Sequence, residues 1–159
     1  MVVELGAGTG PFTAEIQRRL AGRGRHLAIE IDPVLAQRLQ HWHPRAEVIQ
    51  RDAGELRQLL YARGIYQADV VISGLPWALF PLDTQQQLMA DTAEVLSPAG
   101  AFTAFTYAHA VPLVAARRFR ALLVESFEEV VISRTVWRNM PPAFVLHARR
   151  PRKKPVPSQ

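Results

Sequence analysis

A cluster of glycines close to the start of the chain has the composition of a ligand-binding turn. Residues 4–10 have the sequence Glu-Leu-Gly-Ala-Gly-Thr-Gly and lie between an apolar, strand-like run and a segment with helical periodicity. Glycine lets the backbone approach a ligand closely, and the start of a helix offers unpaired N–H groups. A dinucleotide fingerprint would need its third glycine at position 11, where this chain has Pro11. The spacing Gly6-x-Gly8-x-Gly10 therefore favours a nucleoside-like ligand that carries no pyrophosphate.

Two acidic residues follow this turn at the ends of later strand-like runs. Glu30 ends the second run, about twenty residues beyond the turn, where a carboxylate can accept hydrogen bonds from ribose hydroxyls. Asp52 follows the third run, where it can reach the amino group of an adenine. Taken alone, Glu30 also fits a solvated strand end, and Asp52 also fits a helix cap. Together with the glycine turn, at successive strand ends, they predict a nucleoside cofactor site.

The fourth strand-like run leads into a loop that stays apolar. Residues 70–81 have the sequence Val-Val-Ile-Ser-Gly-Leu-Pro-Trp-Ala-Leu-Phe-Pro. A glycine and a proline break the strand, yet the loop lacks the polar residues of an ordinary surface turn. In an open α/β sheet, ligands bind outside the carboxyl ends of the strands, so this loop is a second candidate element of the site.

Strand-length apolar runs alternate with helix-period segments along most of the chain. We expect strands at residues 1–5, 26–31, 46–50, 68–73, 101–107, 127–136 and 143–149, and helices at residues 11–21, 33–41, 55–62, 83–96 and 112–123. No helix separates the last two strands, so they should pair as an antiparallel hairpin. This order predicts an α/β fold, with a Rossmann-like, seven-stranded, mostly parallel sheet, a C-terminal antiparallel hairpin and helices on both faces.

Composition limits the class of protein. The 159 residues are expected to form one domain over residues 1–150, followed by a basic, proline-rich tail at 151–159. The chain has no cysteine, which excludes a disulfide framework, a thiolate metal site and a cysteine nucleophile. Its five scattered histidines do not predict a metal site. The first residues do not have the pattern of a signal peptide, because Glu4 and the glycines interrupt the apolar run, and no uncharged apolar stretch reaches transmembrane length, so we expect a cytoplasmic protein.

The net charge of +5 predicts an anionic partner, which can be nucleic acid or an acidic membrane surface. Much of the excess lies at residues 149–155, a segment that proline should keep extended. This tail is either a docking element or a solubilising one.

The first three strand ends resemble the motifs of the class I S-adenosylmethionine-dependent methyltransferases. Residues 2–10 are similar to the first motif of that superfamily, and residues 28–32 and 51–53 are similar to its second and third motifs. The alternation of strands and helices and the terminal hairpin also match its seven-stranded sheet. The resemblance implies S-adenosylmethionine as the cofactor and covers nearly the whole chain.

The same resemblance implies a set of cofactor-binding residues. The glycine turn would face the methionine part of the cofactor, Glu30 would hold the ribose, and Asp52 with Ala53 would contact the adenine. Glu4 would orient the turn and the amino group of the ligand. The predicted cofactor-binding residues are Glu4, Gly6, Ala7, Gly8, Gly10, Glu30, Ile31, Asp52, Ala53, Ser73, Gly74 and Leu75.

The loop at residues 73–77 would then hold the substrate beside the transferable methyl group. Adenine N6-methyltransferases, including the rRNA adenine dimethylases, carry Asn-Leu-Pro-Tyr or a related sequence there, and its Asn or Asp holds the exocyclic amine. This chain has Gly74 at that position, so base methylation loses its main polar contact. The Ser-Gly-Leu-Pro sequence, together with residues 105–107 and 136–143, instead resembles the bacterial phospholipid N-methyltransferases, which are relatives of the dimethylases.

This resemblance implies in-line attack of a neutral amine on the sulfonium methyl group, with an amine such as the phosphatidylethanolamine head group as acceptor. Tyr107 is the candidate for orienting the amine, and Trp77 or Trp137 for a cation–π platform. Arg138 is the candidate partner of a phosphate diester, and Asn139 beside it completes the candidate set. For the two tryptophans the alternative is core packing, and for Arg138 it is a surface position.

Members of this family carry helices before the first strand that cover the cofactor and contact the membrane, whereas the sequence given begins at the strand. Either its start is truncated or misassigned, or the site is more open and other elements contact the membrane. In the second case the apolar residues Leu79, Phe80 and Leu82 near the substrate loop, helped by the basic tail, would contact an anionic membrane at its inner face. They would equally fit beneath a covering helix. Two other functions stay open: methylation of RNA, which Gly74 disfavours, or of a small metabolite, and cofactor binding without activity.

Overall fold

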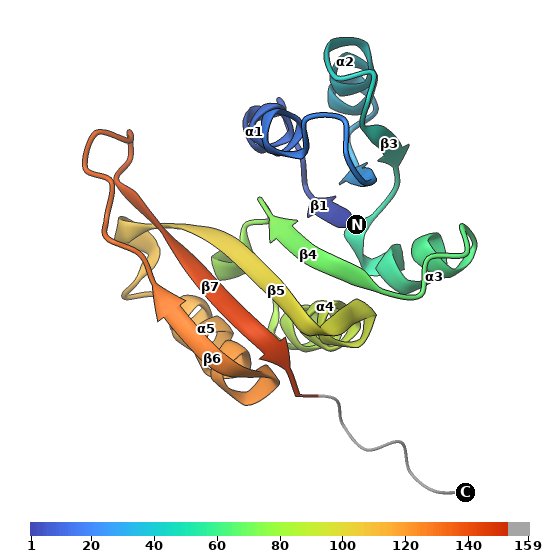
Figure 1. The fold of residues 1–159 in the computed structure, drawn as a ribbon. Coiled ribbons are helices and arrows are strands. Elements are labelled where there is room, and N and C mark those ends of the chain that lie inside the picture. The colour runs from blue at the N-terminus through green and yellow to red at the C-terminus, as the bar shows by residue number, and fades with distance from the viewer. Residues whose placement is uncertain (153–159) are drawn as a thin grey trace, which may run out of the picture.

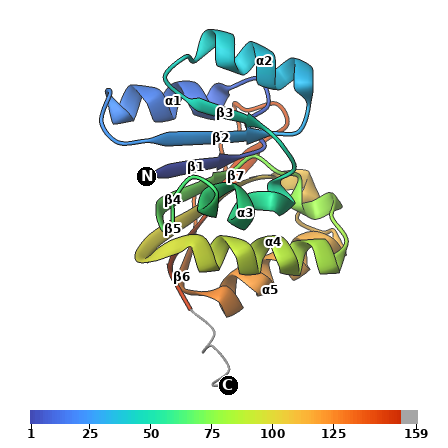
Figure 2. The ribbon, with the colours of Figure 1, turned by 90° about the vertical axis from the view of Figure 1, so that its right-hand side faces the viewer.

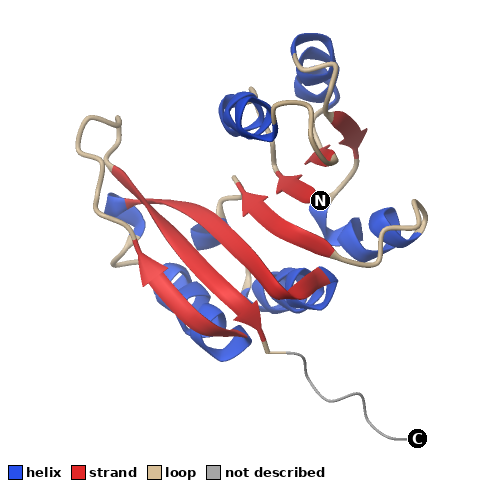
Figure 3. Ribbon diagram, in the orientation of Figure 1, coloured by secondary structure: helices blue, strands red, loops and turns tan. Residues whose placement is uncertain are grey.

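The computed structural model describes residues 1–152 as an open, twisted sheet between two layers of helices (Figures 1 and 3). The strands are β1 (Val2–Leu5), β2 (His26–Glu30), β3 (Glu47–Gln50), β4 (Ala68–Ser73), β5 (Leu96–Tyr107), β6 (Phe127–Ile132) and β7 (Ala143–Pro151). The α-helices are α1 (Pro11–Leu20), α2 (Pro33–Trp42), α3 (Leu56–Tyr61), α4 (Leu82–Val95) and α5 (Val114–Ser126). Short 3-10 helices are η1 (Ala53–Glu55), η2 (Trp77–Leu79) and η3 (Ala108–Ala110).

The strand order is β3-β2-β1-β4-β5-β7-β6. The first five strands in sequence run parallel, and β7 pairs antiparallel with both β5 and β6. Figure 2 shows α1 and α2 on one face of the sheet and α3, α4 and α5 on the other. The predicted fold class is therefore confirmed. The chain adds β2 and β3 on one side of β1 and then β4 and β5 on the other, so the strand order switches at β1. Folds of this kind bind ligands at the carboxyl edge of the sheet beside such a switch point.

The core lies between the sheet and the layer of α3, α4 and α5. The central strands contribute fully buried aliphatic residues such as Val3, Leu27 and Val71. An aromatic cluster continues this core under β5, where Phe119 of α5 stacks on Trp77 at a ring-centroid distance of 4.5 Å. Phe102 contacts both rings edge-on. Full burial of each such side chain contributes about 1.5–3 kcal/mol, so this cluster anchors the loop after β4 firmly.

Several predicted boundaries are wrong. Helix α5, expected at residues 112–123, runs over Val114–Ser126, and three further differences have a local reason. The fifth strand begins at Leu96 rather than at residue 101, because Leu96 pairs with Ala68 of β4 before a register shift. Residues 97–100, which were expected between the helix and the strand, therefore lie within β5. The sixth strand ends at Ile132 rather than at residue 136, and Val136 keeps only an isolated bridge to Ala143. Helix α4 begins at Leu82 rather than at 83, because the Pro81 carbonyl accepts the first turn's hydrogen bond from the N–H of residue 85.

The chain end differs slightly from the expected domain boundary. Strand β7 runs one residue past 150, to the buried Pro151, which pairs with Phe127. The remainder of the predicted tail, from residue 153 onward, lies outside the described residues.

Candidate active site

The glycine turn between β1 and α1 is shaped by close contacts that no side chain would permit. Gly6 has a φ of +67°, and a Cβ there would lie 2.8 Å from the Leu75 side chain. Gly74, at the start of the loop after β4, faces the same turn, and a Cβ there would lie 2.6 Å from the carbonyl oxygen of Gly6. The N–H of Gly74 donates to the carbonyl of Leu5 at 2.8 Å. The two loops are therefore packed backbone against backbone.

Glu30 ties the end of β2 to the glycine turn. Its Oε2 accepts a hydrogen bond from the Gly8 N–H at 2.7 Å, and its Oε1 accepts one from the Asp32 N–H at 2.9 Å. The side chain is buried yet lines a cavity. Each oxygen of a carboxylate can accept a second hydrogen bond, so Glu30 can still bind a pair of hydroxyl groups from the cavity.

Glu4 lies beneath the turn rather than beside the cavity. Its Oε2 accepts a hydrogen bond from the Thr13 hydroxyl at 2.7 Å and lies 3.0 Å from Nε2 of the buried His26. Gln17 lies 2.8 Å from the other ring nitrogen of His26, so β1, α1 and β2 are joined through one buried network. The second oxygen, Oε1, is buried and has no hydrogen-bond partner among the described residues. This network supports the predicted role of Glu4 in orienting the turn.

A cavity of about 490 Å³ opens at the carboxyl ends of β1, β2 and β3. Eight of the twelve predicted cofactor residues line it: Gly6, Gly8, Glu30, Ile31, Asp52, Ala53, Gly74 and Leu75. The other four, Glu4, Ala7, Gly10 and Ser73, are buried beneath it and support the turn and the loop. Prediction from sequence missed Phe80, Thr84 and Leu88, which reach the cavity from the loop and from α4.

Asp52 caps a helix and also lines the cavity. Its Oδ1 caps η1 by accepting a hydrogen bond from the Gly54 N–H at 2.7 Å. The side chain is exposed, and it lines the cavity at the end of β3. The cap fixes the carboxylate while the second oxygen can accept a hydrogen bond from a ligand.

The loop after β4 is held by buried polar groups. The Ser73 hydroxyl accepts a hydrogen bond from the indole N–H of Trp77, four residues later in the chain, at 2.9 Å. Gln85 of α4, which is fully buried, donates from its amide to the Trp77 carbonyl at 2.6 Å and to the Ala115 carbonyl at 3.1 Å. The loop is thereby fixed to both α4 and α5. The sequence contains no signal that would single out Gln85.

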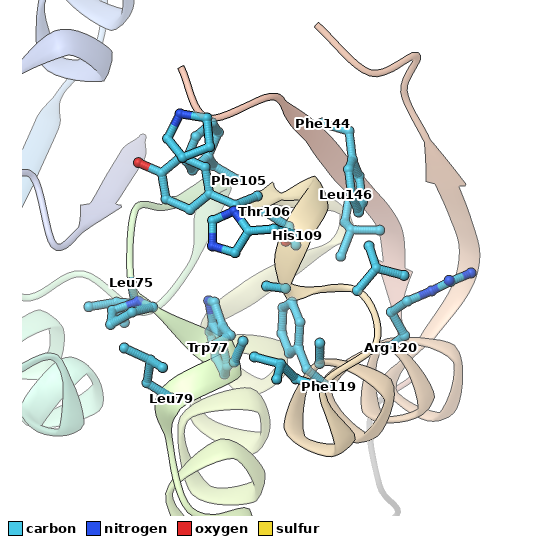
Figure 4. A pocket seen from close by; sticks show the side chains of 18 of the residues that line it. Leu75, Trp77, Leu79, Phe105, Thr106, His109, Phe119, Arg120, Phe144 and Leu146 are labelled. Atoms are coloured by element: carbon cyan, nitrogen blue, oxygen red, sulfur yellow. The ribbon is translucent and has the colours of Figure 1, made fainter. Parts of the chain in front are cut away.

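A second cavity, of about 450 Å³, lies on the other side of this loop. Gly74, Leu75 and Pro76 line both cavities, so these three residues form the boundary between them. The lining comes from η2, the end of β5, η3, α5 and the start of β7, and most of it is aliphatic or aromatic (Figure 4). The polar side chains that line it are Thr106, Tyr107, His109 and Arg120.

The four predicted substrate residues are not all brought together here. Tyr107 lines this second cavity and is 40% exposed. Trp77 lines it as well but is only 3% exposed, and one face of its indole is covered by Phe119, so core packing describes it better than a cation–π platform. Arg138 and Asn139 lie in the β6–β7 loop and line neither cavity, and Asn139 donates to the Pro141 carbonyl.

Two lining residues had no role in the sequence prediction. His109 follows Tyr107 by two residues, in the short helix that ends β5, and Arg120 lies on α5. Neither belongs to a recognisable motif, because each reaches the cavity through tertiary packing: η3 is tied to the start of β7 by the hydrogen bond from Ala108 to Pro142, and α5 packs beside the loop. Over residues 1–152, no group of three acidic or histidine side chains is arranged to hold a metal ion. None of the helices in that range combines the length and the hydropathy needed to cross a bilayer.

The fold and the two cavities that share the loop after β4 define a class: an α/β protein with a candidate nucleoside-cofactor site at the topological switch point and an apolar cavity beside it. Residues 2–100 match the methyltransferase domain family. An ornithine lipid N-methyltransferase from Singulisphaera acidiphila is 40% identical over 146 residues, which are 90% of this chain and 72% of that protein. The chain belongs to the S-adenosylmethionine-dependent methyltransferases, as the motifs predicted.

Solved structures support the fold at low sequence identity. The CurJ carbon methyltransferase superposes with a TM-score of 0.69 at 18% identity, over 94% of this chain and 48% of that one. Fibrillarin from Aeropyrum pernix, solved with natively bound S-adenosylmethionine, superposes with a TM-score of 0.71 at 15% identity, over 92% of this chain and 65% of that one. The chain thus spans about half of the first of these proteins and about two thirds of the second. S-adenosylmethionine is the cofactor of this family, and the cavity at β1–β3 has the groups to hold it.

Proposed function

We propose that this protein transfers the methyl group of S-adenosylmethionine to the amine nitrogen of a membrane-lipid head group. The observation that carries the proposal is the pair of cavities that share Gly74, Leu75 and Pro76. One cavity has the carboxylates and bare backbone that suit a nucleoside, and the other has an apolar lining that suits an acyl-bearing acceptor. Three shared residues mean that the two ligands would meet at one short boundary.

The residues of the first cavity fit the cofactor. Gly6 and Gly8 leave room for close approach of the methionine part, and the Glu30 carboxylate suits the ribose hydroxyls. Asp52 suits the adenine amino group. When bound, the cofactor supplies an electrophilic methyl group on a positively charged sulfur, so the protein needs no metal for the transfer.

The protein's contribution is alignment in a site from which water is excluded. The loop after β4 is anchored by Trp77, Ser73 and Gln85, so the boundary residue Leu75 keeps a fixed position. Tyr107 stands at the mouth of the acceptor cavity, where its hydroxyl can orient an amine. The apolar wall around that amine holds little water to compete with it.

Arg120 replaces Arg138 as the candidate partner for the anionic group of the head group. It is the one arginine among the described residues that line the acceptor cavity, whereas Arg138 lies outside it. Figure 4 shows Arg120 at the side of the cavity opposite Leu75. A lipid whose amine lies at the boundary would therefore present its carboxylate or phosphate toward Arg120. Arginine binds either group with a planar pair of donors.

The surface around the mouth of this cavity suits peripheral contact with an anionic membrane. Leu79, Val111 and Leu113 line the cavity and are also exposed, with Leu79 at 75%. Arg117 and Arg120 are exposed on α5, whose residues Ala116, Phe119 and Arg120 line the same cavity. Apolar residues flanked by arginines are the composition that binds the interface of an anionic bilayer. Phe80, in contrast, packs on the core and lines the cofactor cavity, so it does not serve as the predicted membrane contact.

The Singulisphaera relative supports an amine of a lipid as the acceptor, because its own name specifies N-methylation of ornithine lipid. Methylation of RNA is the second reading. Gly74 has no side chain to hold an adenine amine, and its close contact with Gly6 leaves no space for a side chain at this position. The geometry thus favours the lipid acceptor over the nucleic acid.

The test is transfer of a labelled methyl group from S-adenosylmethionine to four acceptors, with products identified by mass spectrometry. The acceptors are vesicles that contain ornithine lipid, vesicles that contain phosphatidylethanolamine, the free head groups without acyl chains, and an adenine-containing RNA. We expect N-methylated lipid in one or both vesicle arms and little product in the other two. Transfer to RNA or to free head groups at a rate equal to that of the vesicles would overturn the proposal.

A further inference from the structure

The acceptor cavity has an unusual set of ionisable groups. The described residues that line it include no aspartate, glutamate or lysine, and its titratable side chains are Tyr107, His109 and Arg120. Phenol and guanidinium groups do not accept a proton near neutral pH. An imidazole is the side chain that changes charge between pH 5 and 8. His109 is therefore the one lining residue with the chemistry of a base.

The proposed reaction needs such a base. A primary alkylamine resembles lysine, which titrates near pH 10.4, so only roughly one molecule in a thousand is neutral at pH 7. The ammonium form has no lone pair with which to attack a methyl group. The cavity also lacks an anion that would stabilise the ammonium, so a bound amine has to give up a proton to a nearby acceptor.

We propose that His109 removes the proton from the amine of the lipid head group, an inference that rests on the proposed function. The residue lies in η3, directly after the strand end that carries Tyr107. Its ring stacks on that of Tyr107 at a centroid distance of 5.4 Å and an interplanar angle of 17°. Figure 4 shows His109 above Trp77, between Leu75 and Arg120 in this view. The imidazole therefore lines the same cavity as the boundary residues Gly74 and Leu75, where we place the methyl transfer.

The position of His109 is fixed by neighbouring elements. The N–H of Ala108 donates to the carbonyl of Pro142 at 2.8 Å, which ties η3 to the start of β7. The charged and titratable groups that line the cavity with it are Tyr107 on β5 and Arg120 on α5. The Arg120 guanidinium opposes further positive charge on the amine and on the imidazole alike, so the proton has to leave the cavity. His109 itself is exposed, so it can pass that proton to solvent.

The step balances as follows. The ammonium R–NH3⁺ transfers one proton to a neutral ring nitrogen of His109 and becomes R–NH2. The nitrogen lone pair forms the N–CH3 bond while the S–CH3 bond breaks, and the electron pair of that bond stays on sulfur. The products are R–NH2⁺–CH3 and S-adenosylhomocysteine, and the imidazolium returns its proton to water. A second methylation of the same nitrogen would repeat the cycle.

The test compares pH profiles of three proteins: the wild type, His109→Gln, which removes the base, and His109→Phe, which keeps a ring to stack on Tyr107. With an active lipid acceptor, the wild-type kcat should reach a plateau near neutral pH. Both variants should lose roughly 10²-fold in kcat at pH 7 and approach the wild type near pH 10, where the free amine is abundant. Cofactor affinity, measured by calorimetry, should stay unchanged in both, which confirms that they are folded.

The outcomes separate this inference from the proposed function. An unchanged rate in both variants at pH 7 would overturn the role of His109 while the proposed function stands. A wild-type rate in His109→Phe alone would show that stacking, not proton transfer, is the role of the ring. A defect of equal size from pH 7 to pH 10 would contradict a base in the same way. Failure of the wild type to methylate any lipid amine would overturn the proposed function, and this inference with it.

Discussion

Replacement of Gly74 by alanine should weaken cofactor binding through a clash between two backbones. A Cβ at Gly74 would lie 2.6 Å from the carbonyl oxygen of Gly6 and 3.7 Å from that of Leu5. The Gly74 N–H is also bonded to Leu5, so the two loops cannot separate without loss of that hydrogen bond. One of them has to move by roughly half an ångström, and crowding of this kind costs about 1–3 kcal/mol.

The size of the effect on the Kd follows from the position of Gly6 in the lining of the cofactor cavity. Because Gly6 lines the cofactor cavity, a displaced turn changes the shape of that cavity directly. If most of the cost falls on binding, the Kd for S-adenosylhomocysteine should rise by about 5- to 150-fold, at about 1.4 kcal/mol for each tenfold change. The measurement is isothermal titration calorimetry, accompanied by thermal unfolding of the free protein.

Gly64→Ala is the matched control. Gly64, unlike Gly74, has a positive φ, of +67°, but a Cβ there meets no atom within 4 Å, and the residue lines neither cavity. The left-handed conformation should cost about 1–2 kcal/mol in unfolding free energy and leave the Kd unchanged. If Gly74→Ala binds the cofactor as tightly as the wild type or as the control, the packing of the two loops does not shape the site and the reasoning is refuted.

Three further predictions concern single side chains. Glu30→Gln should raise the Kd for S-adenosylhomocysteine by roughly 10- to 100-fold, because hydrogen bonds to a charged group contribute about 1.5–3 kcal/mol; a calorimetric Kd equal to that of the wild type would contradict the assigned ribose contact. Arg120→Gln should raise the KM for the lipid roughly tenfold in initial-rate assays, by loss of one charge-assisted contact, whereas Arg138→Gln should not; equal effects would refute the choice between them. Hydrogen bonds from the two neighbouring arginines of α1 lower the pKa of Glu15 from 4.5 to about 2. The folded-state pKa is depressed, so the stability that this carboxylate contributes is present above about pH 4.5 and is lost as the pH falls toward 2. Thermal unfolding of Glu15→Gln should therefore show a smaller loss of stability across that range than the wild type, and identical pH dependence would exclude the contribution.

The fold could be predicted because each of its elements carries a local signature. Runs of valine, isoleucine and leucine of strand length alternate with helix-period segments, and Asp32 caps α2 through bonds to two backbone N–H groups. The errors fall where a tertiary contact decides the boundary. The start of β5 depends on pairing of Leu96 with β4, and β6 ends early because its regular pairing with β7 stops at Ile132, with only an isolated bridge at Val136. Neither contact is visible in the local sequence.

The cofactor half of the site could be predicted for the same reason. The glycine turn, Glu30 and Asp52 stand at the ends of successive strands, and parallel strands bring those ends to one edge. Even there, the sequence did not separate the residues that line the cavity from those beneath it. Glu4, for example, has an acidic side chain in the motif yet is buried in a network with His26.

The acceptor half could not be predicted, because distant parts of the chain build it. Its lining comes from η2, β5, η3, α5 and β7; the position of His109 depends on how η3 meets β7, and that of Arg120 on how α5 packs. Trp77, the aromatic residue of the loop motif, was predicted to form a platform for the substrate, but it stacks on Phe119 in the core instead. Arg138, for example, has a guanidinium group that could bind an anionic substrate group, but it lines neither cavity.

The most direct test of the central claim, that cofactor and lipid amine meet across the loop after β4, is a crystal structure with S-adenosylhomocysteine and a short-chain amine lipid. We predict that the ribose binds at Glu30, that the sulfur faces Leu75 and Pro76, and that the lipid amine approaches those residues from the cavity of Tyr107 and His109. A lipid amine bound elsewhere, or an adenosine group outside the cavity at β1–β3, would contradict the account.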